Sequence, residues 1–372
     1  MNQITLQRIE IRQVAMTPRR PLTAAHGTID QRPVIIVRVW DEDGAYGWGE
    51  CVAFPTPGYL TETVDTAWAT LQSGVIPAVH NRAFDSPDAL GDYLAGAMPQ
   101  SPVASAPIEM ATWDLLARRQ QRSLANLLGG VRENIPAGKT IGFLESPDRL
   151  IEEVDLARRA GFQRIKVKIE PERALTVAME AVKAANGLPV VADANASFSM
   201  GSVQRLRELD ATGLSWIEQP FSPASLRATA DIRDSLGTPI ALDESVSTMN
   251  ALQRIIDMNA AGAISLKPGR LGGIRAALSA YRAAKAASLS VWIGGMLETG
   301  IGRAHNLALA ALPGFDQVGD MGPSTEYWDR DLITEPFEMV AGHIAVPTAP
   351  GIGVVVDTDY LNAATVERVV VG

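Results

Sequence analysis

Three acidic residues recur at a fixed interval in the middle of the chain, each at the end of a short apolar run. They are Asp193 in "PVVADAN", Glu218 in "LSWIEQP" and Asp243 in "PIALDES", and successive members are 25 residues apart. Carboxylates on successive structural units can together hold a hard divalent cation, because Mg²⁺ and similar ions prefer oxygen ligands. The series therefore predicts a metal site.

Lysines flank this acidic series on both sides. Lys166 and Lys168 in "RIKVKIE" come before it, and Lys267 in "AISLKPG" follows Asp243 by 24 residues. A strand, a turn, a helix and a return turn take roughly 25 residues, so the interval is typical of repeated β/α units. In a parallel barrel the functional residues lie at the C-terminal ends of the strands. The pattern predicts a metal-assisted enzyme with lysines beside the metal.

Strand-like and helical segments alternate from about residue 135 to residue 320, which predicts a (β/α)7β-type modified TIM barrel. In this order Lys168 lies on the second strand and Lys267 on the sixth, so the two amines should face each other across the barrel. Lys166 and Lys168 are two residues apart and should share the inward face. The eight candidate strand cores are "AGKTIGF", "RIKVKI", "PVVADA", "LSWIEQ", "PIALDE", "GAISLK", "SVWIGGM" and "FDQVGD".

The chain divides into three regions. Residues 1–130 read as antiparallel strands followed by helices, which predicts an α+β module. Residues 131–322 form the predicted barrel. Residues 323–372 lose the β/α rhythm, and we expect this tail to return to the N-terminal module.

Composition excludes several classes of protein. Apolar residues make up 47% of the chain, enough for a large core. The net charge of −9 and the absence of a Lys/Arg cluster argue against nucleic acid as a partner. The single cysteine, Cys51, fits a reducing cytosol, and no apolar run reaches the length of a membrane span. We expect a cytoplasmic enzyme that acts on a small carboxylate, with no membrane partner.

The residue types suggest removal of a proton next to a carboxylate. A divalent ion stabilises the enediolate that forms, and a lysine serves as the base if nearby cations and desolvation lower its pKa. Lys166 and Arg270 in "SLKPGRLGG" are cations placed to do this. Two simpler roles stay open: Lys166 as the salt-bridge partner of a ligand carboxylate, and Arg270 as a helix cap or the partner of a surface carboxylate. Oxygen ligands favour Mg²⁺, for which Mn²⁺ can substitute.

The motifs "KVK", "DAN", "EQP", "DES" and "KPG", in this order, resemble the enolase superfamily in its muconate-lactonising subgroup. "RPVIIVRVWDEDGAYGWGECVA", "APIEMATWDLLAR" and "GGMLETGIGRAHNLALAALPGF" are similar to the o-succinylbenzoate synthase/N-acylamino acid racemase family. The resemblance covers nearly the whole chain. One stretch departs from it, "DQVGDMGPSTEYW", where typical members are richer in Ser and Ala.

The resemblance implies a role for each matching residue. It makes Asp193, Glu218 and Asp243 the Mg²⁺ ligands and Lys168 and Lys267 the acid/base pair. The N-terminal module becomes a capping domain whose loops, near residues 22–28 and 52–59, close over the barrel and select the substrate. We also expect a homo-oligomer. Supporting residues are Lys166, Asn195, Glu244 and Arg270, and substrate-loop candidates are His26, Phe54, Tyr59 and Met296.

The reaction that the resemblance favours is syn dehydration of 2-succinyl-6-hydroxy-2,4-cyclohexadiene-1-carboxylate to o-succinylbenzoate, a menaquinone precursor. The alternative is racemisation of N-acylamino acids, such as N-succinylamino acids, by the same two lysines. A third possibility is a non-catalytic barrel that serves as a binding or scaffold protein. The mandelate-racemase-like branch is disfavoured, because it carries Lys-x-His where this chain has "KVK".

Overall fold

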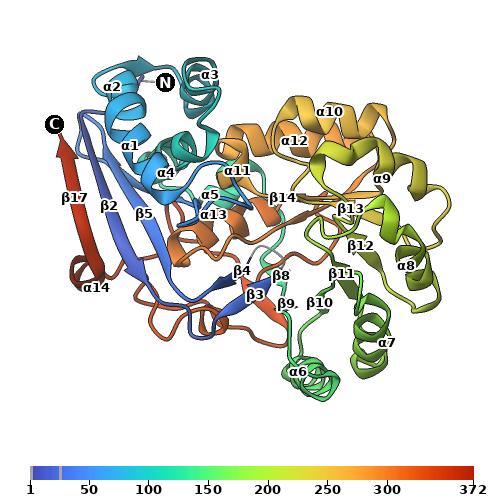
Figure 1. The fold of residues 1–372 in the computed structure, drawn as a ribbon. Helices are drawn as coiled ribbons and strands as arrows, with labels where there is room; N and C mark the ends of the chain where they lie inside the picture. Colours follow the sequence, from blue (N-terminus) through green and yellow to red (C-terminus); the bar gives the residue numbers. More distant parts are fainter. Residues whose placement is uncertain (1–2, 25–26) are drawn as a thin grey trace.

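A computed structural model describes residues 3–24 and 27–372 (Figure 1). The N-terminal region builds a four-stranded antiparallel sheet in the order β17-β2-β5-β6. In β2, Ile9, Ile11 and Val14 are buried in the two hydrophobic cores that border the sheet. The strands are β2 (Arg8–Met16), β5 (Arg32–Trp40), β6 (Tyr46–Cys51) and β17 (Thr365–Val371).

Helix α4 (Pro102–Arg119) packs closely against β6 and is buried along most of its length. The close approach requires glycine in the strand, since a Cβ atom on Gly49 would lie 2.0 Å from the carbonyl oxygen of Pro107. The shorter elements of this region are β1 (Ile4–Thr5), β3 (Leu22–Ala24), β4 (Gly27–Ile29), α1 (Val64–Thr70), α2 (Ile76–Val79), β7 (Ala83–Phe84), α3 (Pro87–Ala97) and α5 (Leu124–Leu128).

Seven parallel strands form the second region, in the sheet order β15-β14-β13-β12-β11-β10-β9. Their order follows the sequence without a reversal, and helices cover the outside of the curved sheet (Figure 1). The strands are β9 (Gly138–Ile141), β10 (Arg164–Lys168), β11 (Val190–Asp193), β12 (Trp216–Glu218), β13 (Ile240–Leu242), β14 (Ala263–Leu266) and β15 (Ser290–Ile293). The helices are α6 (Pro147–Ala160), α7 (Ala174–Ala185), α8 (Val203–Glu208), α9 (Leu226–Arg233), α10 (Met249–Asp257), α11 (Pro268–Leu271), α12 (Ile274–Ala286) and α13 (Gly300–Ala310).

The predicted modified barrel is confirmed, but the eighth strand core, "FDQVGD", is not a strand. This segment instead crosses the gap between the two outer strands of the sheet. Asp320 N–H donates to the Ile293 carbonyl (2.9 Å) after β15, and Gly138 N–H of β9 donates to the Met321 carbonyl (2.9 Å). Each side of the segment makes one such bond, too few for a strand ladder, so isolated hydrogen bonds join β15 to β9.

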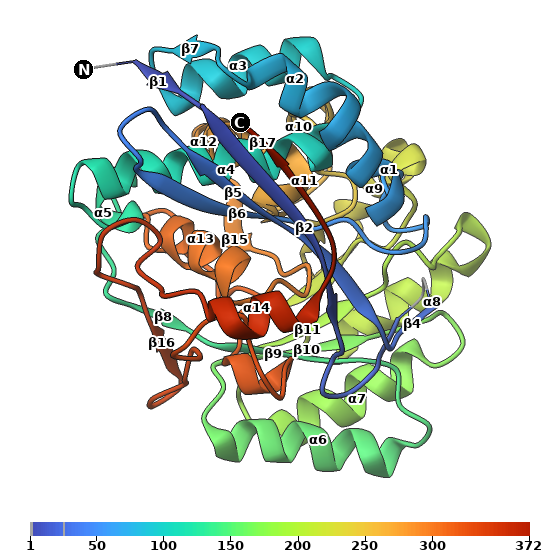
Figure 2. The ribbon, with the colours of Figure 1, turned by 90° about the vertical axis from the view of Figure 1, so that its left-hand side faces the viewer.

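The C-terminal tail contacts both regions. Strand β16 (His343–Ala345) pairs with β8 (Asn134–Pro136), and α14 (Thr358–Ala364) leads into β17, which pairs antiparallel with β2. Figure 2 shows β17 running beside β2 at the edge of the N-terminal sheet. The boundaries of the three regions stay predictions. Within the described residues, no helix has both the length and the apolar character needed to cross a membrane.

Candidate active site

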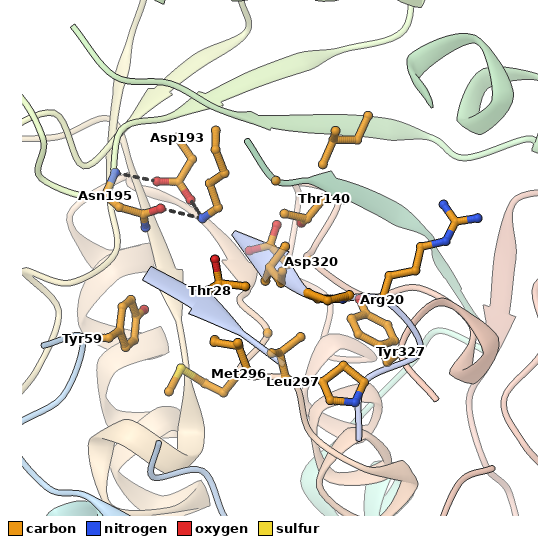
Figure 3. Close-up of a pocket in the computed structure, with 18 of the residues that line it drawn as sticks. Arg20, Thr28, Tyr59, Thr140, Asp193, Asn195, Met296, Leu297, Asp320 and Tyr327 are labelled. Atoms are coloured by element: carbon orange, nitrogen blue, oxygen red, sulfur yellow. Dashed lines mark hydrogen bonds and ion pairs between the residues drawn. The ribbon is translucent and has the colours of Figure 1, made fainter. Parts of the chain in front are cut away.

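A cavity of about 610 Å³ lies between the N-terminal loops and the C-terminal ends of the barrel strands. Figure 3 shows Asp193 and Asn195 at one end of it and Arg20 and Tyr327 at the other. Thr28, from the N-terminal hairpin, lies between these ends (Figure 3). The cavity is therefore built jointly by the two regions. That it is the substrate site, as the resemblance implies, stays a prediction.

The three predicted carboxylates stand side by side on neighbouring strands. Asp193 ends β11 and is the register partner of Glu218, which ends β12, while Asp243 follows β13 directly. All three are buried. Lys168 is the register partner of Asp193 on the other side, so the sheet places amine and carboxylates in one row.

Amines of β10 bind the first two carboxylates. Lys166 Nζ lies 2.8 Å from Glu218 Oε1 and 3.4 Å from Asp193 Oδ2. Lys168 Nζ lies 2.7 Å from Asp193 Oδ2 and donates to Asn195 Oδ1, also at 2.7 Å. Lys166 is thus the salt-bridge partner of these carboxylates, and both Lys166 and Lys168 line the cavity.

At the other end of this row, Asp243 contacts two cations and a phenol. Lys267 Nζ lies 2.8 Å from Asp243 Oδ2, and Arg270 donates to Asp243 Oδ1 at 2.8 Å. Tyr59 O–H donates to Asp243 Oδ2 (2.8 Å) and accepts from both Lys267 and Arg270. Because Tyr59 belongs to an N-terminal loop, that region directly contacts the second lysine. Arg270 is buried in this network and does not act as a helix cap.

Gln219 positions the turn that carries Asp243, a role that the sequence analysis missed. Its Oε1 accepts from the backbone N–H groups of Asp243 (3.0 Å) and Ser245 (3.1 Å). Gln219 and Asn195 both have positive φ, 42° and 41°, which is uncommon for residues other than glycine. Such conformations cluster at functional sites, where the surrounding packing holds them in place.

The charges of the site shift its pKa values in opposite directions. Burial opposes ionisation of Asp243, but Lys267 and Arg270 hold its pKa well below the usual value. Burial raises the pKa of Glu218 to about 8 despite Lys166, since neighbouring carboxylates add to the effect. Of the three strand-end carboxylates, Glu218 is therefore the one whose burial is least offset by neighbouring cations.

The donor set fits a divalent cation. Glu218 Oε2 is buried, and it has no hydrogen-bond partner among the described residues. A buried carboxylate oxygen without a partner is costly, and a bound cation would satisfy it. Across the described ranges, no three acidic or histidine side chains already form a complete metal cluster. Lysine amines instead contact carboxylate oxygens that would otherwise coordinate a cation. The three carboxylates therefore suit a cation by their chemistry and position, but they do not form a complete coordination sphere.

Of the remaining predicted residues, three line the cavity, one joins the row of carboxylates, and one lies outside the described residues. Phe54, Tyr59 and Met296 line the cavity. Glu244 accepts from Asn195 Nδ2 at 2.9 Å and so joins the row beside Asp193. His26 lies outside the described residues.

Asp320 is a cavity residue that the sequence analysis did not single out. It ends the segment that replaces the eighth strand, and its Oδ2 lies 2.7 Å from Lys166 Nζ. Its other oxygen pairs with Arg164, at the base of β10. The signal was present in the sequence, because "VGD" ends the eighth β/α unit as "VAD" ends the third.

Comparison with known families identifies this arrangement. Residues 149–360 match the enolase C-terminal domain-like family, and residues 8–129 match the N-terminal domain of the mandelate racemase/muconate lactonizing enzyme family. The chain belongs to the enolase superfamily. Within it, the relatives described next place the chain in the muconate-lactonising subgroup, as the motifs indicated.

Curated superfamily relatives resemble the chain over almost its full length. An o-succinylbenzoate synthase from Geobacillus kaustophilus is 38% identical, with 97% of this chain and 96% of the relative covered. An N-succinylamino acid racemase from Thermus thermophilus is 35% identical, with 98% and 97% covered. A solved enolase-superfamily structure from Listeria innocua superposes with a TM-score of 0.95 at 31% identity and 99% coverage of both chains. These relatives are enzymes, so the chain belongs to a family of lyases and isomerases.

Proposed function

We propose that this chain is a divalent-metal-dependent o-succinylbenzoate synthase. The observation that carries the proposal is the pair of buried lysines, Lys168 on β10 and Lys267 after β14, on strands four places apart in the sheet. Each contacts one of the strand-end carboxylates, and both line the same cavity. A substrate between them has an amine on each face of its α-carbon.

Asp193, Glu218 and Asp243 would hold the metal, which we propose to be Mg²⁺ with Mn²⁺ as a substitute. When bound, it would withdraw charge from the substrate carboxylate and so acidify the α-proton. Lys168 removes that proton and returns it to the departing hydroxide on the same face. Lys267 stays cationic, held by Asp243 and Tyr59, and stabilises the negative charge on the opposite face.

Racemisation of N-succinylamino acids is the second candidate function. It is favoured by the similar placement of the two lysines, since each is buried and each is in contact with a carboxylate. Racemisation needs a base on one face and an acid on the other. Arg270 beside Lys267 supports this role, since family members that racemise typically carry arginine there. The same site would then serve two reactions.

The decisive measurement is kcat/KM for both substrates, side by side, on the metal-free protein and after Mg²⁺ is restored. We expect turnover only with metal, and a higher kcat/KM for dehydration. A preparation with full activity after complete chelation would contradict the metal assignment. We further propose that the enzyme is a cytoplasmic homo-oligomer that binds a small carboxylate, which sedimentation and ligand-binding measurements would test.

A further inference from the structure

Arg32 is a fully buried arginine in the N-terminal region, with 0% of its surface exposed. Its four hydrogen bonds to described residues all go to backbone carbonyl oxygens. NH1 donates to Pro33 (2.8 Å) and Ala53 (2.6 Å), and NH2 donates to Val52 (3.1 Å) and Met296 (3.2 Å). A buried cation needs such partners, because leaving it without them would cost several kcal/mol.

The acceptors belong to three segments that are distant in the sequence. Pro33 lies in β5, Val52 and Ala53 follow β6, and Met296 follows β15 of the barrel. The guanidinium is a rigid planar fork, so its donors fix the relative positions of these segments. One side chain thus ties an N-terminal loop to a barrel loop.

The flat face of the same guanidinium supports the cavity wall. It lies 4.6 Å from the centre of the Phe54 ring, which in turn meets the Tyr59 ring edge-on at 5.8 Å and 87°. Phe54, Tyr59 and Met296 line the cavity, and Arg32 lies behind them. We call these three residues, two aromatic rings and a methionine, the aromatic wall.

We propose that Arg32 is a positioning residue that sets substrate specificity by holding the aromatic wall in place. Tyr59 accepts a hydrogen bond from Lys267, so the wall lies beside the position of the substrate α-carbon. The group bonded to that carbon packs against the wall. The inference rests on the proposed function only for the identity of this group, an amino-acid side chain in the racemase reaction.

Arg38 offers a matched control on the same strand. It is six residues from Arg32, so both side chains leave β5 on the same face of the sheet. Arg38 also stacks on aromatic rings, 4.2 Å from Tyr46 and 4.7 Å from Trp48. It does not line the cavity. Arg38→Lys therefore reproduces the loss of a stacked guanidinium at a distance from the aromatic wall.

The experiment compares Arg32→Lys with Arg38→Lys on N-succinylphenylalanine and N-succinylalanine. Lysine keeps the charge, but a single ammonium cannot reach carbonyls on three segments. In Arg32→Lys we expect kcat/KM for the phenylalanine compound, divided by kcat/KM for the alanine compound, to fall about five- to tenfold. The fall should come mainly from a higher KM for the phenylalanine compound. In Arg38→Lys the ratio should stay at the wild-type value. Partial unfolding cannot produce this result, because it lowers both kcat/KM values by the same factor.

Hydrogen exchange provides a readout that does not need turnover. Backbone amides of residues 52–60 should exchange about tenfold faster in Arg32→Lys than in wild type, and at the wild-type rate in Arg38→Lys. If wild type turned over neither compound, the racemase function would fail while this comparison still tested the role of Arg32. If Arg32→Lys does not fold, Phe54→Leu removes the ring that Arg32 holds at the cavity and should shift the kcat/KM ratio in the same direction. An unchanged ratio, or unchanged exchange, would overturn the proposal.

Discussion

Two sets of buried carboxylates in this molecule have opposite surroundings. The strand-end set, Asp193, Glu218 and Asp243, contacts lysine and arginine side chains. The second set, Glu50 and Glu109, lies between the N-terminal region and the barrel, and we call its members the interface glutamates. They accept mainly from backbone N–H groups.

Each interface glutamate binds the N-terminus of a barrel helix. Glu50 of β6 accepts from the N–H groups of Thr299 (2.9 Å) and Gly302 (2.9 Å), at the start of α13. Glu109 of α4 accepts from Ile274 (2.8 Å) and Arg275 (2.9 Å), at the start of α12. These N–H groups have no partner within their own helices, and the helix dipole favours a negative charge there.

The two sets of carboxylates differ in whether their hydrogen-bond partners can be exchanged. Backbone N–H groups are fixed by the helices, so the interface glutamates have partners that do not move. Lysine side chains can rotate away, so the strand-end carboxylates can exchange an amine for a cation or a substrate. The same chemical group, a buried carboxylate, therefore stabilises the fold at one place and supports chemistry at the other.

The largest expected effect is the loss of a strand-end amine. Lys168→Ala should lower kcat/KM for both dehydration and racemisation by about 10³-fold or more, because both reactions need a base on that face. The thermal midpoint should change little, since residues at strand ends serve function more than stability. Residual activity within tenfold of wild type would show that Lys168 is not the base.

Asp243→Asn should separate metal binding from folding. We expect Mg²⁺ or Mn²⁺ affinity to fall about tenfold or more, as losses in metal-site shells typically do. The far-ultraviolet circular dichroism spectrum should be unchanged. Titration with Mn²⁺, followed by its electron paramagnetic resonance signal, measures the affinity directly, and wild-type affinity in the variant would remove Asp243 from the ligand set.

Lys267→Arg should separate the two chemistries by stereochemistry. Arginine keeps the positive charge but is a poor acid or base, because its pKa lies above 12. Racemisation should therefore suffer more than dehydration. In D₂O, one enantiomer of N-succinylphenylalanine should still exchange its α-hydrogen through Lys168, and the other should not. Wild-type exchange of both enantiomers would contradict the arrangement of one lysine on each face.

Glu109→Ala should show the opposite behaviour to the strand-end variants. Removing a buried acceptor leaves the N–H groups of α12 without partners, and we expect a loss of about 2–4 kcal/mol in the free energy of unfolding. The kcat of the folded enzyme should stay near wild type. Urea unfolding and active-site-normalised kinetics measure the two quantities, and a fall in kcat without a loss of stability would break the contrast between the two sets.

The smallest predicted effect is a pH dependence of stability. Burial raises the pKa of Glu50 from 4.5 to about 7, despite the hydrogen bonds from Thr299. The folded state then binds its proton more tightly than the unfolded chain does. The stability from this group is present below pH 4.5 and is lost as the pH rises through about 7. The loss amounts to about 3 kcal/mol at most.

Glu50→Gln keeps an acceptor oxygen but does not titrate, so it isolates this contribution. The difference between urea midpoints at pH 5 and pH 8 should be smaller in the variant than in wild type. Equal differences would mean that Glu50 does not bind the proton. Other carboxylates contribute to the wild-type pH profile, but they are common to both proteins and cancel in the comparison.

Local sequence patterns predicted the barrel and its strand-end residues well, because each β/α unit repeats the same length and ends in a polar residue. Asp193 and Lys168 follow from that rhythm alone. The segment that ends at Asp320 was misjudged, since its composition resembles a strand while its hydrogen bonds depend on the distance between β15 and β9. That distance is a property of the closed barrel, which no local pattern contains.

Contacts between the two regions were harder to predict. Arg32 looks like an ordinary strand arginine, and its carbonyl partners at positions 52, 53 and 296 have no sequence signature, because any residue type offers a carbonyl oxygen. Tyr59 was predicted as a substrate contact, and its bond to Lys267 comes from docking of the two regions. Side chains whose partners are distant backbone atoms are the ones that sequence reasoning misses.

The pairing of β17 with β2 has a consequence for how the protein is made. Strand β2 begins at Arg8, whereas β17 ends at Val371, so the sheet joins two segments that lie far apart in the sequence. Residues 365–371 leave the ribosome long after β2, so β2 must wait for them with one edge unpaired. The N-terminal sheet can reach its full width only after residues 365–371 have been synthesised. A product that stalls before residue 365 would leave that edge of β2 unpaired and open to pairing with other chains.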